Sequence, residues 1–218
     1  MSDKRDEQMD SVITGFELTL TNLVAEPEIA AIMQAHGFPQ DRVDAGLALV
    51  RAARAKQQAR QAELGSRLQA TTAFEQAFAA ASKAYADFRE TARAHYKSAS
   101  DNPEVWQTLG LTGRMPRDTQ GFISAAYATF DNALASQAIV DALTPYGYDS
   151  SKITDARGLV AAAAAANQAQ ERAKGAALGT TTEQNDAYEQ AKDWMSAFKR
   201  IARRALQDRP DLLLKLGM

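Results

Sequence analysis

The sequence predicts an all-α protein, and three observations support that prediction. About a fifth of the 218 residues are alanine, the strongest helix former. Glycine and proline, which interrupt helices, number only 12 and 6, and aromatic residues, which favour strands, make up 7%. Apolar residues also recur at helical spacing along most of the chain. We expect a tandem duplication of a three-helix up-down-up unit of about 110 residues plus a short terminal helix, packed as a pseudo-twofold helical bundle.

The duplication is visible when the chain is shifted against itself by about 110 residues. Residues 13–96 then align without a gap with residues 123–206, with about 22 identical pairs. Shared residues other than alanine include Ile13/Ile123, Asn22/Asn132, Gly37/Gly147, Gly65/Gly175 and Phe88/Phe198. After a short gap, residues 101–111 align with 208–218. The sequence is therefore divided into a flexible N-terminus at 1–9, helical repeat 1 at 10–111, a linker at 112–118 and helical repeat 2 at 119–218.

Each repeat is expected to open with a long helix and a short one. The first helix of repeat 1 starts near Asp10, and its apolar stripe runs from Ile13 to Leu23 at steps of three and four. Pro27 fits the first turn of the short helix that follows. Gly37 and its partner Gly147 fit the caps that end these helices. A second long helix should then span about 39–64 in repeat 1 and 150–174 in repeat 2.

A loop is expected after each second helix, because Gly65 and Gly175 stand there and paired threonines follow. Thr72 with Glu75, and Thr180 with Glu183, have the spacing of a capping box at the start of a third helix. That helix carries a seam of apolar residues at steps of four and three, namely Phe74, Phe78, Ala81, Tyr85, Phe88 and Ala92 in repeat 1. The terminal helices should start at Pro103 and Pro210, capped by Asp101 and Asp208.

Composition and charge argue against several classes of protein. The 25 basic and 27 acidic residues nearly balance, whereas a nucleic-acid-binding domain is usually strongly basic. The chain has no cysteine, which removes thiolate nucleophiles and cysteine-ligated zinc. The longest apolar run, 159–166, is far shorter than the roughly 20 residues of a membrane span, and the first ten residues lack the apolar core of a secretory signal. We expect a cytoplasmic protein that binds neither nucleic acid nor membrane.

Catalytic, metal-binding and cofactor-binding motifs are not found in the sequence. His95 follows Glu90 by five positions rather than the three of a di-iron bundle, and His36 precedes Gly37 at a helix end, where histidine is favoured for its charge. The nucleophile elbow, the dinucleotide-binding fingerprint and the phosphate-binding loop have no match. We therefore predict no catalytic residue, no metal ligand and no cofactor.

Charged residues on the helices are interpreted as solvated faces. Asp87 and Glu90 stand among Arg89 and Arg93, which suggests local ion pairs on an exposed surface. The basic clusters at 51–67 and 199–204 could contact phosphates, but interleaved acidic residues favour a solvated face. Trp194 aligns with Ala84 of repeat 1, and we expect it to face smaller residues across a helix contact.

Two functions remain open from the sequence. The first is a non-enzymatic interaction or scaffold protein that contacts a protein partner through its helical surface, because the shared residues preserve architecture rather than chemistry. The alternative is a small-molecule binding bundle with an apolar interhelical pocket lined by Phe74, Phe78, Tyr85 and Phe88. An enzyme or metal protein ranks third. The sequence leaves the oligomeric state open, along with the question of whether the repeats form one bundle or two.

Overall fold

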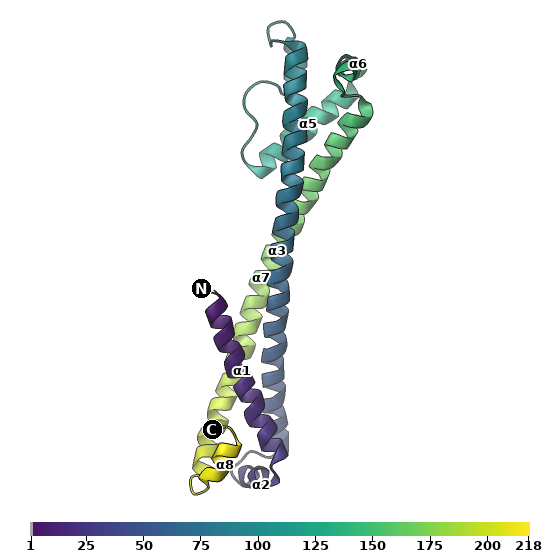
Figure 1. The fold of residues 1–218 in the computed structure, drawn as a ribbon. Coiled ribbons are helices and arrows are strands. Elements are labelled where there is room, and N and C mark those ends of the chain that lie inside the picture. The colour runs from purple at the N-terminus through teal and green to yellow at the C-terminus, as the bar shows by residue number, and fades with distance from the viewer. Residues whose placement is uncertain (1) are drawn as a thin grey trace. The chain divides into compact units, whose positions relative to one another are not determined.

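The structure is a computed structural model that describes residues 2–218, and the side chains of residues 4–218. It confirms the all-α prediction, because residues 2–218 form eight α-helices and one 3₁₀ turn and contain no strand (Figure 1). In chain order these are α1 (Ser2–Ala25), α2 (Pro27–Ala35), α3 (Gln40–Tyr96), α4 (Pro103–Thr108), α5 (Thr119–Ala135), α6 (Gln137–Leu143), η1 (Thr144–Tyr146), α7 (Ser150–Ala205) and α8 (Pro210–Lys215). Over this part of the chain, no helix combines the length and the apolar character that crossing a bilayer requires.

The prediction of two separate helices on either side of Gly65 is wrong. Helix α3 continues for 57 residues through that glycine, and α7 continues for 56 residues through Gly175. A single helical glycine costs only about 1 kcal/mol relative to alanine, and the strong helix formers around it outweigh that cost. The paired threonines do not cap a helix. The Thr71 and Thr72 hydroxyls instead donate to the carbonyl oxygens four residues earlier.

Because α3 and α7 are continuous, neither repeat is an up-down-up unit of three helices. The chain instead divides into two compact units that each draw on both repeats. Unit 1 comprises the residues up to Gly65 together with Gly175–Met218, and unit 2 comprises Ser66–Lys174. Of the expected flexible segment 1–9, Met1 lies outside the described residues, and the chain is helical from Ser2.

Unit 1 has its own hydrophobic core. Helix α1 contributes the predicted apolar stripe, of which Ile13, Phe16, Leu20 and Leu23 are all buried, and α2 adds buried apolar side chains to the core. The first half of α3 and the second half of α7 supply the other walls, with Phe198 completely buried. Ion pairs surround this core, because Arg54 of α3 binds Asp10 and Glu17 of α1.

Unit 2 has a second core, built from the same kinds of element. The second half of α3 places Ala81, Tyr85, Phe88 and Ala92 in it, as the predicted seam requires. Helices α5 and α6 and the first half of α7 supply the facing apolar side chains, and the segment after α4 adds Leu109 and Leu111. Phe130 of α5 contacts both Tyr85 and Phe88, with ring centroids 5.9 and 5.2 Å apart.

Turns and caps fix the ends of the short helices. Gly37 and Gly147 have φ values of +84° and +83°, a region that only glycine enters readily, so their prediction as helix-ending residues is confirmed. The linker at 112–118 is free of helix, and Asp118 caps α5 by accepting a hydrogen bond from the Gly121 amide. The terminal helices begin at the predicted prolines, but no side chain caps either of them. The predicted caps at Asp101 and Asp208 are therefore wrong.

Candidate binding groove

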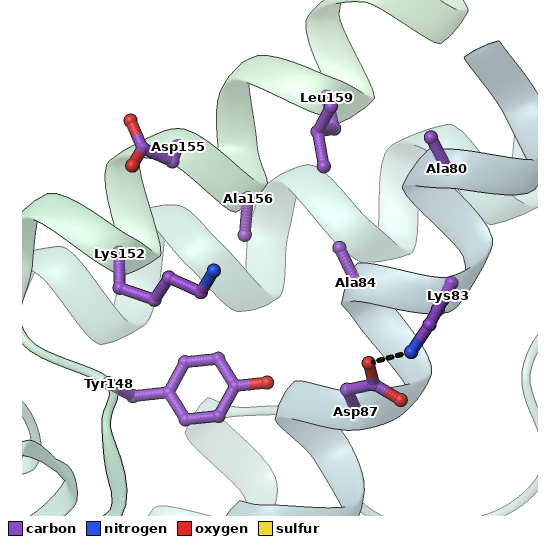
Figure 2. A pocket seen from close by; sticks show the side chains of 9 residues that line it. All are labelled: Ala80, Lys83, Ala84, Asp87, Tyr148, Lys152, Asp155, Ala156 and Leu159. Atoms are coloured by element: carbon purple, nitrogen blue, oxygen red, sulfur yellow. Dashed lines mark hydrogen bonds and ion pairs between the residues drawn. The ribbon is translucent and has the colours of Figure 1, made fainter.

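The candidate site is a groove in unit 2, between the second half of α3 and the first half of α7, with a cavity of about 370 Å³ (Figure 2). The loop after η1 contributes one residue to its lining. The residues that line the groove are Ala80, Lys83, Ala84 and Asp87 of α3, Tyr148 of the loop, and Lys152, Asp155, Ala156 and Leu159 of α7.

The floor of the groove is apolar because small side chains occupy the positions where the two helices face each other. Ala84 and Ala156 project into the same space from opposite helices, as Figure 2 shows, and Ala156 is buried. Ala80 and Leu159 extend this floor along the groove. Leu159 is 39% exposed. The floor therefore presents apolar surface to solvent.

The rim of the groove carries charges of both signs. On α3, Lys83 donates a 2.7 Å hydrogen bond to Asp87 one helical turn away, and this bond raises the pKa of the Lys83 ammonium. On α7, Lys152 and Asp155 line the opposite wall. Both walls thus offer a cation and a carboxylate to whatever enters.

Tyr148 directs its ring and hydroxyl toward the other side chains that line the groove, as Figure 2 shows. Its ring packs edge-on against Phe88 of the core, with centroids 5.2 Å apart, and Gly147 provides the turn that brings it there. Burial raises the pKa of the Tyr148 hydroxyl, and the nearby negative charge of Asp87 raises it further. The hydroxyl is therefore neutral near pH 7 and can both donate and accept a hydrogen bond.

The corresponding place in unit 1 is filled. Trp194 stands at the position that aligns with Ala84, stacks on Phe198 with ring centroids 5.5 Å apart, and meets Phe38 edge-on. Gly46, which aligns with Ala156, makes room for the indole, because a β-carbon there would lie 2.6 Å from Cε2 of Trp194. The expectation that Trp194 faces a smaller residue is confirmed.

The four residues of the predicted apolar pocket all lie in unit 2, on one side of α3. Tyr85 and Phe88 are buried in the core, whereas Phe74 and Phe78 are half-buried. Phe78 packs on Phe122 of α5, with ring centroids 4.8 Å apart, and on Phe74 at 5.5 Å. The structure thus brings these aromatic rings into one cluster with Phe122 and Phe130 of α5. The groove of Figure 2 lies next to this aromatic cluster, because Tyr148 lines the groove and its ring contacts Phe88.

Both histidines lie at helix ends, as the sequence predicts for His36. His36 ends α2, and its Nδ1 lies 2.8 Å from the Ile32 carbonyl oxygen. His95 is in the last turn of α3, where its ring contacts Tyr96 and Tyr146. Within residues 4–218, no three His, Asp or Glu side chains come together in an arrangement that could hold a metal ion.

Sequence reasoning missed the environment of two arginines. Arg89 is only 4% exposed, and it donates to the carbonyl oxygens of Leu111 and Gly113 rather than to Asp87 or a solvated partner. Arg93 binds the same two carbonyl oxygens. The prediction of a solvated face is therefore wrong for Arg89, whereas Asp87 and Glu90 are exposed and Asp87 forms a local ion pair with Lys83. Helical spacing contained the signal, because Arg89 follows the seam residue Tyr85 by four positions and lies on nearly the same face.

Comparisons with known proteins add no relative to this description. No protein-family model matches the chain, and no curated protein and no solved structure matches it.

Proposed function

We propose that this chain is a non-enzymatic interaction or scaffold protein, and that the groove of unit 2 is its contact surface. The observation that carries the proposal is the difference between two aligned positions. Trp194 fills unit 1, whereas Ala84 leaves the aligned place open in unit 2. The alanines leave the apolar floor of the groove open to solvent, and apolar surface of this kind is what a partner covers.

The chemistry of the groove favours an amphipathic helix of a partner protein as the occupant. The alanine floor and Leu159 offer contact to one large apolar side chain, and the rim offers Lys83 and Asp87 on one side and Lys152 on the other. Helices that bind in grooves use an apolar stripe for affinity and flanking charges for orientation. A partner helix with an apolar stripe and charged residues of both signs beside that stripe would match the apolar floor and the charged rim of the groove. We place this activity in the cytoplasm, as the sequence suggests.

We also propose that the chain arose by a tandem duplication, as its sequence repeat indicates. Paired hydrogen bonds support this. Asn22 donates through Nδ2 to the Lys215 carbonyl oxygen at 2.7 Å, and Asn132 donates to the Thr108 carbonyl oxygen at 2.7 Å. In each pair the asparagine belongs to one repeat and the terminal helix to the other. The two repeats would thus have exchanged their terminal helices reciprocally.

A small molecule is the second candidate occupant. A cavity of about 370 Å³ lies within the range of about 300–1,000 Å³ that ligand pockets occupy. The hydroxyl of Tyr148 and the ammonium of Lys152 would orient such a ligand. In that case the ligand would copurify from cells, and native mass spectrometry of the intact protein would show its added mass.

A photo-crosslinking experiment in the source cells tests the interaction proposal. Benzoylphenylalanine is placed at Leu159, on the groove floor, or at Leu68, an exposed leucine of unit 2 outside the groove lining. We expect position 159 to capture a protein that position 68 does not capture. The same protein, produced recombinantly, should bind the purified chain. Equal capture at both positions, or no capture at position 159, would contradict the proposal.

A further inference from the structure

Two arginines of unit 2, Arg89 and Arg93, lie close together, and no carboxylate in the described part of the chain forms an ion pair with either of them. The guanidinium groups of Arg89 and Arg93 converge on the carbonyl oxygens of Leu111 and Gly113 at the start of the linker. Burial lowers the pKa of Arg93, and the neighbouring positive charge of Arg89 lowers it further. Two like charges are thus held together by neutral acceptors.

No carboxylate within residues 4–218 forms an ion pair with Arg89, Arg93 or Arg114. Glu90 borders a cavity beside Arg93 but lies beyond ion-pair distance of it. Buried charges in proteins are nearly always paired with a charge of opposite sign. Arg89, at 4% exposure, departs from this rule.

The donors of Arg89 are only partly used. Its Nη1 donates to the Tyr85 hydroxyl, and its Nη2 donates to the two linker carbonyl oxygens, whereas Nε has no described acceptor. A guanidinium carries five N–H groups, so donors remain for a further acceptor. Arg89 lines a cavity of about 320 Å³ together with Arg114, Thr112 and Thr108. Arginine side chains and hydroxyls are the donors that proteins direct at oxyanions.

Unit 1 keeps the two positive charges, because Lys199 and Arg203 align with Arg89 and Arg93, but it lacks the tyrosine that binds Arg89. Positions that align with Tyr85 and Arg89 hold Met195 and Lys199, and Lys199 lies over the ring of Phe16. The hydrogen-bonded pair of Tyr85 and Arg89 therefore has no counterpart at the aligned positions of unit 1.

We propose that Arg89 and Arg114 bind a small oxyanion, a phosphate or a carboxylate group, in the cavity beside the linker. Arg93 reinforces the positive potential there. The oxyanion supplies the missing negative charge and accepts the unused hydrogen bonds of Arg89. This site has no lining residue in common with the α3–α7 groove.

Isothermal titration calorimetry of the full chain tests this site, with inorganic phosphate in one arm and acetate in the other. Sodium chloride keeps the ionic strength constant, so a general salt effect is removed. We expect saturable binding of one anion per chain in at least one arm. The arm that binds more tightly identifies the oxyanion. The absence of saturable binding in both arms overturns the proposal.

Two variants locate the binding. Arg114→Gln changes an exposed residue that lines the cavity, and it should weaken binding by about tenfold or more. Arg117→Gln removes an equal charge from the same linker outside the cavity lining, and it should change the affinity by less than about twofold. Equal weakening by both variants would mean nonspecific attraction and would overturn the assignment.

Discussion

Gly46 of α3 and Trp194 of α7 fit together in unit 1, because the absence of a side chain on the glycine leaves the space that the indole occupies. A β-carbon at position 46 would lie 2.6 Å from Cε2 of the indole, closer than real β-carbons approach other atoms. The aligned residues in unit 2 are Ala156 and Ala84, and they form the floor of the groove instead. The helix contact of unit 1 is thus filled by Trp194, whereas the aligned contact of unit 2 has the small Ala84 and stays open.

Adding a methyl group at this contact should destabilise the protein. Gly46→Ala forces the indole of Trp194 or the backbone to shift, which overpacks the contact and should cost about 1–3 kcal/mol. Urea denaturation followed by circular dichroism measures the loss. The control is the same substitution in a Trp194→Ala background, where Gly46→Ala should cost nothing. A cost that persists without the indole would show that the backbone at position 46, rather than Trp194, requires glycine.

The opposite result is expected where a helical glycine faces open space. A β-carbon at Gly65 would have no neighbouring atom within 4 Å, and the glycine lies in the interior of α3. Gly65→Ala should therefore raise the free energy of unfolding by about 0.5–1 kcal/mol. Gly37→Ala provides the contrast, since its φ of +84° should make alanine destabilising. A loss of stability in Gly65→Ala would argue against a continuous α3 at that residue.

Phe88 and Phe198 should be equivalent core residues of the two units. Both are completely buried, Phe88 against Phe130 and Phe198 against Phe38, with ring centroids 5.2 Å apart in each contact. Truncating either to alanine should cost on the order of 3–5 kcal/mol in chemical denaturation. Leu68→Ala, at a residue 70% exposed, should change stability by less than about 0.5 kcal/mol. A phenylalanine variant that loses under about 1 kcal/mol would contradict the seam.

Tyr148 should ionise at a higher pH than an ordinary tyrosine, whose pKa is about 10. Burial and the charge of Asp87 both disfavour the phenolate and so raise the pKa of the hydroxyl. Because the folded pKa is raised, the stabilisation by neutral Tyr148 is complete below pH of about 10 and is lost as the pH rises through the folded pKa.

The phenolate absorbance of the wild-type protein minus that of Tyr148→Phe isolates this titration. Asp87→Asn removes the negative charge and should move the Tyr148 pKa downward. An unchanged or higher pKa in Asp87→Asn would show that Asp87 does not act on the hydroxyl.

Local sequence patterns predicted the helices, their apolar seams and the turns at Gly37 and Gly147. They failed at Gly65, because a glycine-threonine segment is compatible with a loop or with a helix interior, and only the packing of its neighbours decides between them. That one error changed the topology, because a continuous α3 contributes residues to both units instead of turning back within one repeat.

The candidate site was only partly predictable. The aromatic residues Phe88 and Tyr85 were identified as core, but the groove depends on which helix faces Ala84, and periodicity within one helix does not reveal its partner. The alignment of Trp194 with Ala84 was the usable signal, since a tryptophan at a position that aligns with an alanine implies a difference in filled volume. Arg89 escaped notice because charged residues beside a seam are usually solvated.

The groove of unit 2 is proposed to bind a partner because it lacks the indole that fills the aligned place in unit 1. The double variant Ala84→Trp/Ala156→Gly copies the Trp194–Gly46 pairing into unit 2, so it should close the groove while the thermal stability is retained or raised. The most direct measurement is the dissociation constant of the crosslinked partner for the wild-type chain and for this variant. We predict that closing the groove weakens binding by at least about tenfold. Equal affinity of the folded variant and the wild-type chain would contradict the account.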